Sequence, residues 1–229
     1  MIPLDFEKYT NSKLYVVFEF LYKIIFINIF WFVTTVFGLG IFTFMPAVIT
    51  GYILIASVQH EREFPIFKAF FTIFKKVYIK SQKLFISLGI LGVILVFNIN
   101  FFYQSFLINP SFFHSIGLLL TVVIFFSYIF TCLYTPLIAI HFPRLSVKDT
   151  IKLSFLTSVG MLFHTILMIV IIIGLVFLML SFPAFFPLLP IGAFSLTAYF
   201  FLLITRGKFY KMTKGKQPLL VTDFVEEIK

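Results

Sequence analysis

The residue types that carry out catalysis are scattered through this sequence and form no recognisable constellation. The 229-residue chain has one cysteine, Cys132, so it has neither an internal disulfide nor a C-x-x-C motif. It also lacks H-E-x-x-H, G-x-S-x-G and Walker-type lysine motifs. Catalysis usually requires ionisable groups that converge on one place. We therefore expect a protein that is not an enzyme and that has no metal centre and no cofactor. The four histidines are also far apart, at His60, His114, His141 and His164.

The composition indicates a chain whose solvent is lipid. It is 61% hydrophobic and 12% charged, whereas a soluble domain is about half apolar and about a quarter charged. At roughly 20 residues per crossing, the length allows about six membrane spans with their loops. We therefore expect an all-α integral membrane protein. Its net charge of +9 is typical of basic cytoplasmic loops, and nucleic acid is not an expected partner.

Six apolar segments are long enough to cross the bilayer, and together they make a single membrane domain over residues 1–229. The N-terminus lacks the pattern of a cleaved signal peptide, so we expect the first span to remain in the mature protein. A polar tail of mixed charge is expected over 206–229. The expected spans cover about 14–38, 41–59, 84–106, 116–140, 151–180 and 188–205.

The first two spans are expected to form a closely packed hairpin. Gly38, Leu39 and Gly40 separate them, and two glycines favour a tight turn. Ala47 and Gly51 in the second span form a small-x-x-x-small pattern, which allows another helix to approach closely.

Two short-range patterns predict local interactions near the ends of helices. Glu19 and Lys23 stand four residues apart, in the favourable order for an ion pair on a helix. We interpret them as a paired anchor at the membrane interface. Ser146 and Asp149 resemble a capping box and predict a helix that begins just after Ser146.

Residues 66–83 are predicted to form a basic amphipathic helix in the membrane interface. Lys68, Lys75, Lys76 and Lys80 share one side at helical spacing, and aromatic residues share the other. Such helices commonly anchor a protein to anionic lipid headgroups. The second interpretation is a docking surface for a partner, either a cytoplasmic protein or a membrane transporter.

The distribution of charge predicts the orientation of the chain. The expected outer turns near residue 40, at 107–115 and at 181–187 contain no charged residue. Positive residues stay on the cytoplasmic side, so we expect six crossings of a bacterial plasma membrane with both termini in the cytoplasm. All Lys, Arg, Asp and Glu residues fall in the segments 1–23, 60–83, 141–152 and 206–229.

Polar side chains within the spans define an alternative function, a small channel or secondary carrier. An ionisable residue such as His164 inside a span is a functional hypothesis by default. The commoner case is a neutral imidazole that hydrogen-bonds a neighbour such as Tyr128 or Thr131. The polar path of such a carrier would consist of Asn100, Tyr103, Gln104, Tyr128, Thr131 and His164.

The first third of the chain also contains a recognisable set of residues. They are Asn28, Trp31, the run Thr-Phe-Met-Pro-Ala at 43–47, and Phe-Lys-Ala-Phe-Phe at 67–71 leading into Lys75 and Lys76. In these residues the chain resembles the YesL-like family of bacterial multi-pass membrane proteins of unknown function. That family usually has Gly where this chain has Met45.

The resemblance implies an accessory role in carbohydrate uptake or sensing, because genes of this family often lie beside sugar-uptake and glycan-degradation genes in Gram-positive bacteria. Our leading hypothesis is accordingly a non-enzymatic accessory or partner-binding membrane protein.

Overall fold

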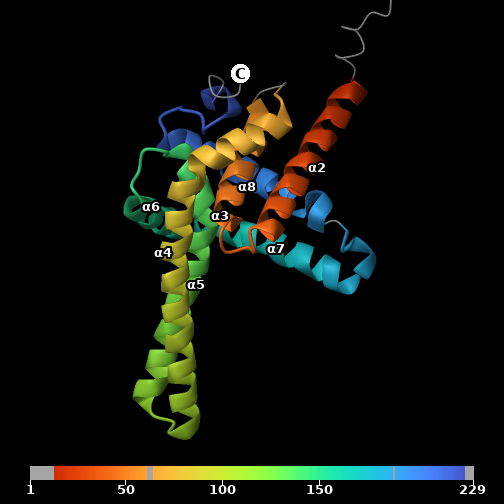
Figure 1. Cartoon of the computed structure of the whole chain (residues 1–229). Coiled ribbons are helices and arrows are strands. Elements are labelled where there is room, and N and C mark those ends of the chain that lie inside the picture. Colours follow the sequence, from red (N-terminus) through yellow and green to blue (C-terminus); the bar gives the residue numbers. More distant parts are fainter. Residues whose placement is uncertain (1–12, 61–63, 188, 225–229) are drawn as a thin grey trace, which may run out of the picture.

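The computed structural model describes residues 13–60, 64–187 and 189–224, and no strand occurs in them. The all-α fold class is therefore confirmed (Figure 1). The elements are α2 (Lys13–Phe37), α3 (Phe44–His60), α4 (Ile66–Ile108), α5 (Phe112–His141), α6 (Val147–Gly160), α7 (Leu162–Ser181), η1 (Pro183–Phe185), η2 (Leu189–Ala193), α8 (Phe194–Met212) and η3 (Val221–Phe224).

The surfaces of these helices are those of a protein that lies in lipid. By length and composition, α2, α4, α5, α7 and the segment Leu189–Met212 are each able to cross a membrane, and α3 is a shorter apolar helix. Large apolar side chains such as Phe97, Phe112 and Phe163 are at least 70% exposed. A soluble monomer rarely exposes apolar surface so extensively, so this surface is suited to contact with lipid chains.

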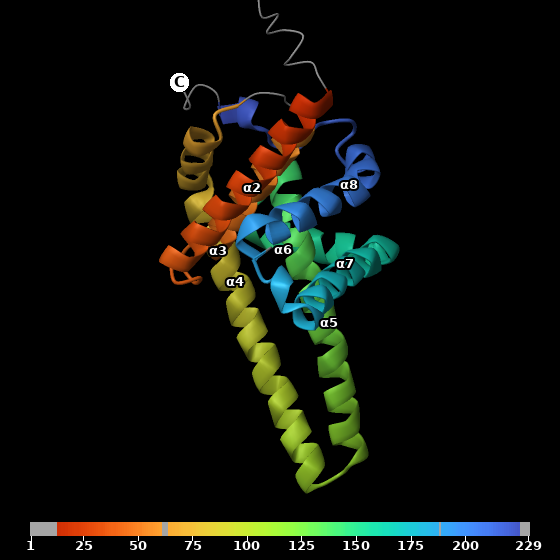
Figure 2. The same cartoon turned by 90° about the vertical axis from the view of Figure 1, so that its right-hand side faces the viewer.

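The longest elements, α4 and α5, form an antiparallel hairpin that projects from the rest of the molecule (Figures 1 and 2). The expected interfacial helix 66–83 and span 84–106 are not separate, because α4 runs through both without a break. Its first part lies across the end of the molecule, and its direction then changes (Figure 1). Near this change the Ser81 hydroxyl donates to the Val77 carbonyl at 2.8 Å, an interaction that often bends helices.

The span expected over 151–180 is two helices, α6 and α7, which meet at Met161. Helix α6 begins after Ser146, whose Oγ accepts from the Asp149 amide at 3.2 Å, so the predicted cap is confirmed. At the break, the Thr165 hydroxyl lies 2.9 Å from the Ser158 carbonyl oxygen, to which it donates. Helix α7 then runs across the α4–α5 hairpin instead of alongside it (Figure 1).

The span expected over 188–205 also begins irregularly, with the π-helical η2. The buried side chain of Asn28 fastens this segment to α2. Its Nδ2 donates to the Leu189 carbonyl at 2.7 Å, and its Oδ1 accepts from the Ser195 amide at 3.0 Å. One amide side chain thus satisfies backbone groups on both sides of the point where α8 starts.

The described part of the polar tail expected over 206–229 is partly packed against the helices. Residues 206–212 continue α8, and Leu220, Val221 and Phe224 are buried. The Val221 amide donates to Ser57 Oγ at 2.7 Å. The chain therefore folds back over the ends of α3 and α5, and residues 225–229 lie outside the described part.

The remaining expectations for the first hairpin are confirmed. Leu39 and Gly40 both have positive φ, at 53° and 70°, in the turn between α2 and α3. A Cβ built at Gly51 would lie 2.5 Å from Cε1 of Phe194. The small residue therefore does allow close packing, and the element that approaches it is the start of α8.

Candidate functional site

The charged segments gather at one end of the molecule. The beginnings of α2 and α4, the end of α8 and the returning segment 213–224 lie opposite the tip of the α4–α5 hairpin (Figure 1). Residues 84–143, which form the hairpin and its turn, include no charged residue. We call the region of residues 64–83, 141–152 and 206–224 the basic end.

The predicted lysine row lies on a well-packed part of the basic end. On the inner side of α4, Ala69 and Phe70 are fully buried. On its outer side Lys68, Lys75 and Lys76 are exposed. The inner contacts therefore fix the helix from which these three lysines project.

Lys80 differs from the other three lysines. It is only partly exposed, and its Nζ donates to the Pro143 carbonyl at 2.6 Å. Partial burial lowers the pKa of Lys80 because it disfavours the charged form. This lysine joins α4 to the link between α5 and α6, which makes its role largely structural.

The predicted pair of Glu19 and Lys23 is confirmed, with 2.7 Å between Oε1 and Nζ. The Lys23 ammonium also lies 4.9 Å from the centre of the Phe64 ring, just before α4. The pair therefore ties α2 to the beginning of α4 at the basic end. Lys23 is only 5% exposed, so the pair is largely buried, and its role as a paired interfacial anchor stays a prediction.

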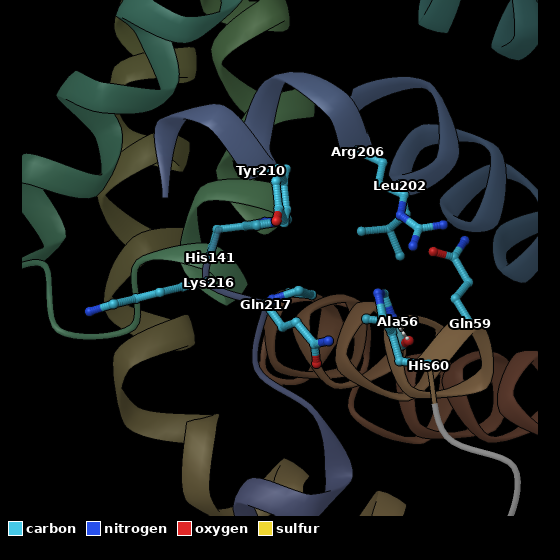
Figure 3. A pocket seen from close by; sticks show the side chains of 10 residues that line it. Ala56, Gln59, His60, His141, Leu202, Arg206, Tyr210, Lys216 and Gln217 are labelled. Atoms are coloured by element: carbon cyan, nitrogen blue, oxygen red, sulfur yellow. Dashed lines mark hydrogen bonds between the residues drawn. The ribbon is translucent and has the colours of Figure 1, made fainter. Parts of the chain in front are cut away.

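A polar cavity of about 90 Å³ lies at the same end (Figure 3). The ends of α3 and α5 supply its two imidazoles, His60 and His141, and α8 supplies Arg206 and Tyr210. No sequence pattern indicates this cluster, because its members lie on three helices that are distant in the sequence. The only signal was that each histidine ends a long apolar segment. The lining residues are Ala56, Gln59, His60, His141, Leu202, Arg206, Tyr210, Lys216, Gln217 and Pro218.

The two histidines of this cavity are oriented alike. In each, Nδ1 lies 2.8 Å from the carbonyl oxygen four residues earlier, that of Ala56 for His60 and that of Leu137 for His141. A carbonyl oxygen only accepts, so Nδ1 carries the proton in both rings. Nε2 is therefore the nitrogen of each ring that is available to a ligand. Within the described residues, no group of three or more metal-ligating side chains occurs.

A larger and mostly apolar cavity of about 440 Å³ lies where α2, α3, α4, α5, α7 and α8 converge. Trp31, Phe194 and Gly89 line it, and Tyr128 and Cys132 are among its few polar groups. Its lining suits an apolar molecule better than an ion or a sugar.

The residues of the predicted polar path are spread over three helices. Asn100, Tyr103 and Gln104 are exposed near the C-terminal end of α4. Of the six residues, only Tyr128 lines the mostly apolar cavity of about 440 Å³. No hydrogen bond joins any two of the six side chains, all of which the structure describes.

The neighbours expected for His164 are also different. The Thr131 hydroxyl donates to the Ser127 carbonyl of its own helix at 2.8 Å. Tyr134 pairs with Thr165, beside His164, with 3.3 Å between the two hydroxyl oxygens. His164 itself lies half-buried near the start of α7, with its ring against Phe163. Conduction through this region stays a prediction.

Comparison with known proteins relates the chain to proteins without an assigned function. A family described as "Protein of unknown function, DUF624" matches residues 24–99. The uncharacterized protein YteU of Bacillus subtilis (strain 168) is 28% identical over 183 residues, which cover 77% of this chain and 78% of that protein. No solved structure gives a significant match. The matches support an uncharacterised family of helical membrane-like proteins, and the narrower YesL-like assignment stays a prediction.

Proposed function

We propose that this chain is a non-enzymatic accessory protein of the bacterial plasma membrane that binds a partner through the exposed lysines of α4. The observation that supports this most is the separation of charge. One end holds the exposed ammonium groups of Lys68, Lys75 and Lys76, and the α4–α5 hairpin holds no charge over residues 84–143. Positive segments remain cytoplasmic, so these lysines would face the cytoplasm.

The packing beneath the lysines favours docking over simple anchoring. A helix that only anchors needs its apolar side for the lipid. Here that side is divided, because Ala69, Phe70 and Ile73 are fully buried against protein whereas Phe67 and Ile79 are exposed. The buried residues fix the helix that presents the lysines, and charge complementarity gives specificity on such surfaces.

The partner that fits this surface is a cytoplasmic protein or a membrane transporter with an acidic face. Anionic lipid headgroups are the competing ligand. The resemblance to the YesL-like family supports a role linked to carbohydrate uptake or sensing. It bears on the process in which the complex would take part, and not on which residues bind the partner.

Affinity purification in mild detergent from native membranes tests this proposal. The variant Lys68→Glu/Lys75→Glu/Lys76→Glu should insert normally and lose the co-purifying partner. Lys80 is left intact because its contact with Pro143 is structural. The control is Lys208→Glu/Lys211→Glu, which makes charge reversals on exposed residues of α8. An unchanged set of co-purifying proteins in the α4 variant would contradict the proposal.

A further inference from the structure

We propose that the cavity formed by His60, His141 and Arg206 binds a small oxyanion of the phosphate type, either free or as part of a larger ester. This is a ligand site and not a docking surface, so it does not depend on the lysines of α4. The cavity lies where the ends of α3 and α5 meet α8 and the returning segment 216–218 (Figure 3).

The charge of the cavity favours an anion. Arg206 is exposed, and its guanidinium makes no hydrogen bond or ion pair with any residue that the structure describes. No acidic side chain from the described residues lines the cavity. Figure 3 shows the Arg206 head and the Gln59 amide facing each other, whereas the Lys216 ammonium points away. The positive charge of the site therefore comes from Arg206, whose planar fork matches two oxygens of one phosphate group.

The imidazoles can add donors to the site only in their protonated form. Because Nδ1 of each ring is held by a carbonyl of its own helix, Nε2 is the atom that can meet a ligand. The His141 ring is also fixed by stacking on Phe209, with 4.2 Å between ring centres and 23° between planes. An anion nearby stabilises the protonated form of a histidine. Burial lowers the pKa of His141 to about 4, so its Nε2 donates only when a bound anion offsets that effect. An oxyanion would therefore bind together with a proton, and more tightly as the pH falls.

The cavity has room for a phosphate group. Its volume is about 90 Å³, which is more than a single water molecule needs. Arg206, Tyr210 and Gln217 are exposed, so the cavity opens to the surface. The rest of an esterified ligand would lie outside, as a soluble phosphate ester or as a lipid headgroup.

Binding of inorganic phosphate to the purified full-length protein in uncharged detergent tests the site. Calorimetric titration at constant ionic strength, with chloride as the reference salt, should show saturable binding. Removing the Arg206 charge with Arg206→Gln should weaken binding tenfold or more, because charge-assisted bidentate contacts are the strongest in such a site. Arg206→Lys keeps the charge but loses the fork, so it should weaken binding to an intermediate degree.

Lys208→Gln is the matched control, because Lys208 lies on the same helix and does not line the cavity. It should change phosphate affinity less than twofold. Equal effects of Arg206→Gln and Lys208→Gln would show non-specific charge attraction and overturn the proposal. Since Arg206→Gln can fail to fold, His60→Gln serves as a second variant, and it should also weaken binding.

Nanodiscs distinguish the two sources of the phosphate group. If the ligand is a lipid headgroup, phosphatidic acid in a phosphatidylcholine bilayer should displace inorganic phosphate in the parent protein and not in Arg206→Gln. If the ligand is soluble, inorganic phosphate should bind equally with and without phosphatidic acid. Both outcomes require the site, and the absence of binding in both bilayers would overturn it. Loss of the co-purifying partner in the α4 variant would leave phosphate binding unchanged, so the two proposals fail separately.

Discussion

The indole ring of Trp31 lies flat on the phenyl ring of Phe194, with 4.4 Å between ring centres and 9° between planes. Asn28 and Gly51 contact the same segment of the chain, through hydrogen bonds and through the Phe194 ring. These three residues lie in the segment that matches the family of unknown function, and Phe194 lies outside it. The matched segment therefore packs against the irregular start of α8 and hydrogen-bonds to it.

Replacing Asn28 tests the hydrogen bonds that join α2 to the start of α8. Asn28→Ala leaves the Leu189 carbonyl and the Ser195 amide without the partner that the buried Asn28 side chain provides. We expect the free energy of unfolding to fall by about 1–3 kcal/mol. Unfolding by titration of SDS into mixed micelles measures this loss. Asn98→Ala is the control, because the exposed Asn98 bonds only the Ile94 carbonyl of its own helix, and equal losses in both variants would contradict the role of Asn28.

Replacing Gly51 tests the close packing of the Phe194 ring against α3. Gly51→Ala forces its new Cβ against Phe194, which is already stacked on Trp31, so we expect a loss of about 1–2 kcal/mol. Gly89→Ala is the control, because a Cβ there meets no atom within 4 Å. The double variant Gly51→Ala/Phe194→Leu should lose less than the sum of its single variants. Strict additivity would show that the two residues are not in contact.

Some features of this fold were predictable because they depend on local pattern. The 3.6-residue repeat of lysines placed the charged side of α4, and the Ser146 cap placed the start of α6. The break between α6 and α7 was not predictable from hydropathy. Thr150 and Ser154 are fully buried against protein. A hydropathy profile does not distinguish such residues from the rest of an apolar span.

The returning tail and the polar cavity depend on contacts that are distant in the sequence. The signals that the tail would be buried were Leu219, Leu220, Val221 and Phe224, which are apolar residues in an otherwise polar segment. The cavity needs His60, His141 and Arg206 from three different helices, and no spacing rule connects them. Periodicity therefore predicts which side of a helix is charged, but not which helix ends meet.

The alternative of a small channel or carrier gives a separate prediction. The six polar side chains of the predicted path are not gathered, so we expect proteoliposomes to show no flux of sugars or ions above empty liposomes. Radiolabelled sugars and ion-sensitive dyes inside the vesicles measure this. Flux that His164→Ala abolishes, and that the control His114→Ala at the hairpin turn retains, would establish the carrier instead.

The central claim is that the charged segments all face the cytoplasm, and labelling of single cysteines in intact cells tests it most directly. In a Cys132→Ser background, cysteines replace the exposed residues Lys76, Lys148 and Pro110, the last in the turn between α4 and α5. A membrane-impermeant maleimide should label only Pro110→Cys before lysis and all three variants after it. Labelling of Lys76→Cys or Lys148→Cys from outside, without labelling of Pro110→Cys, would contradict the orientation and the proposed docking surface with it.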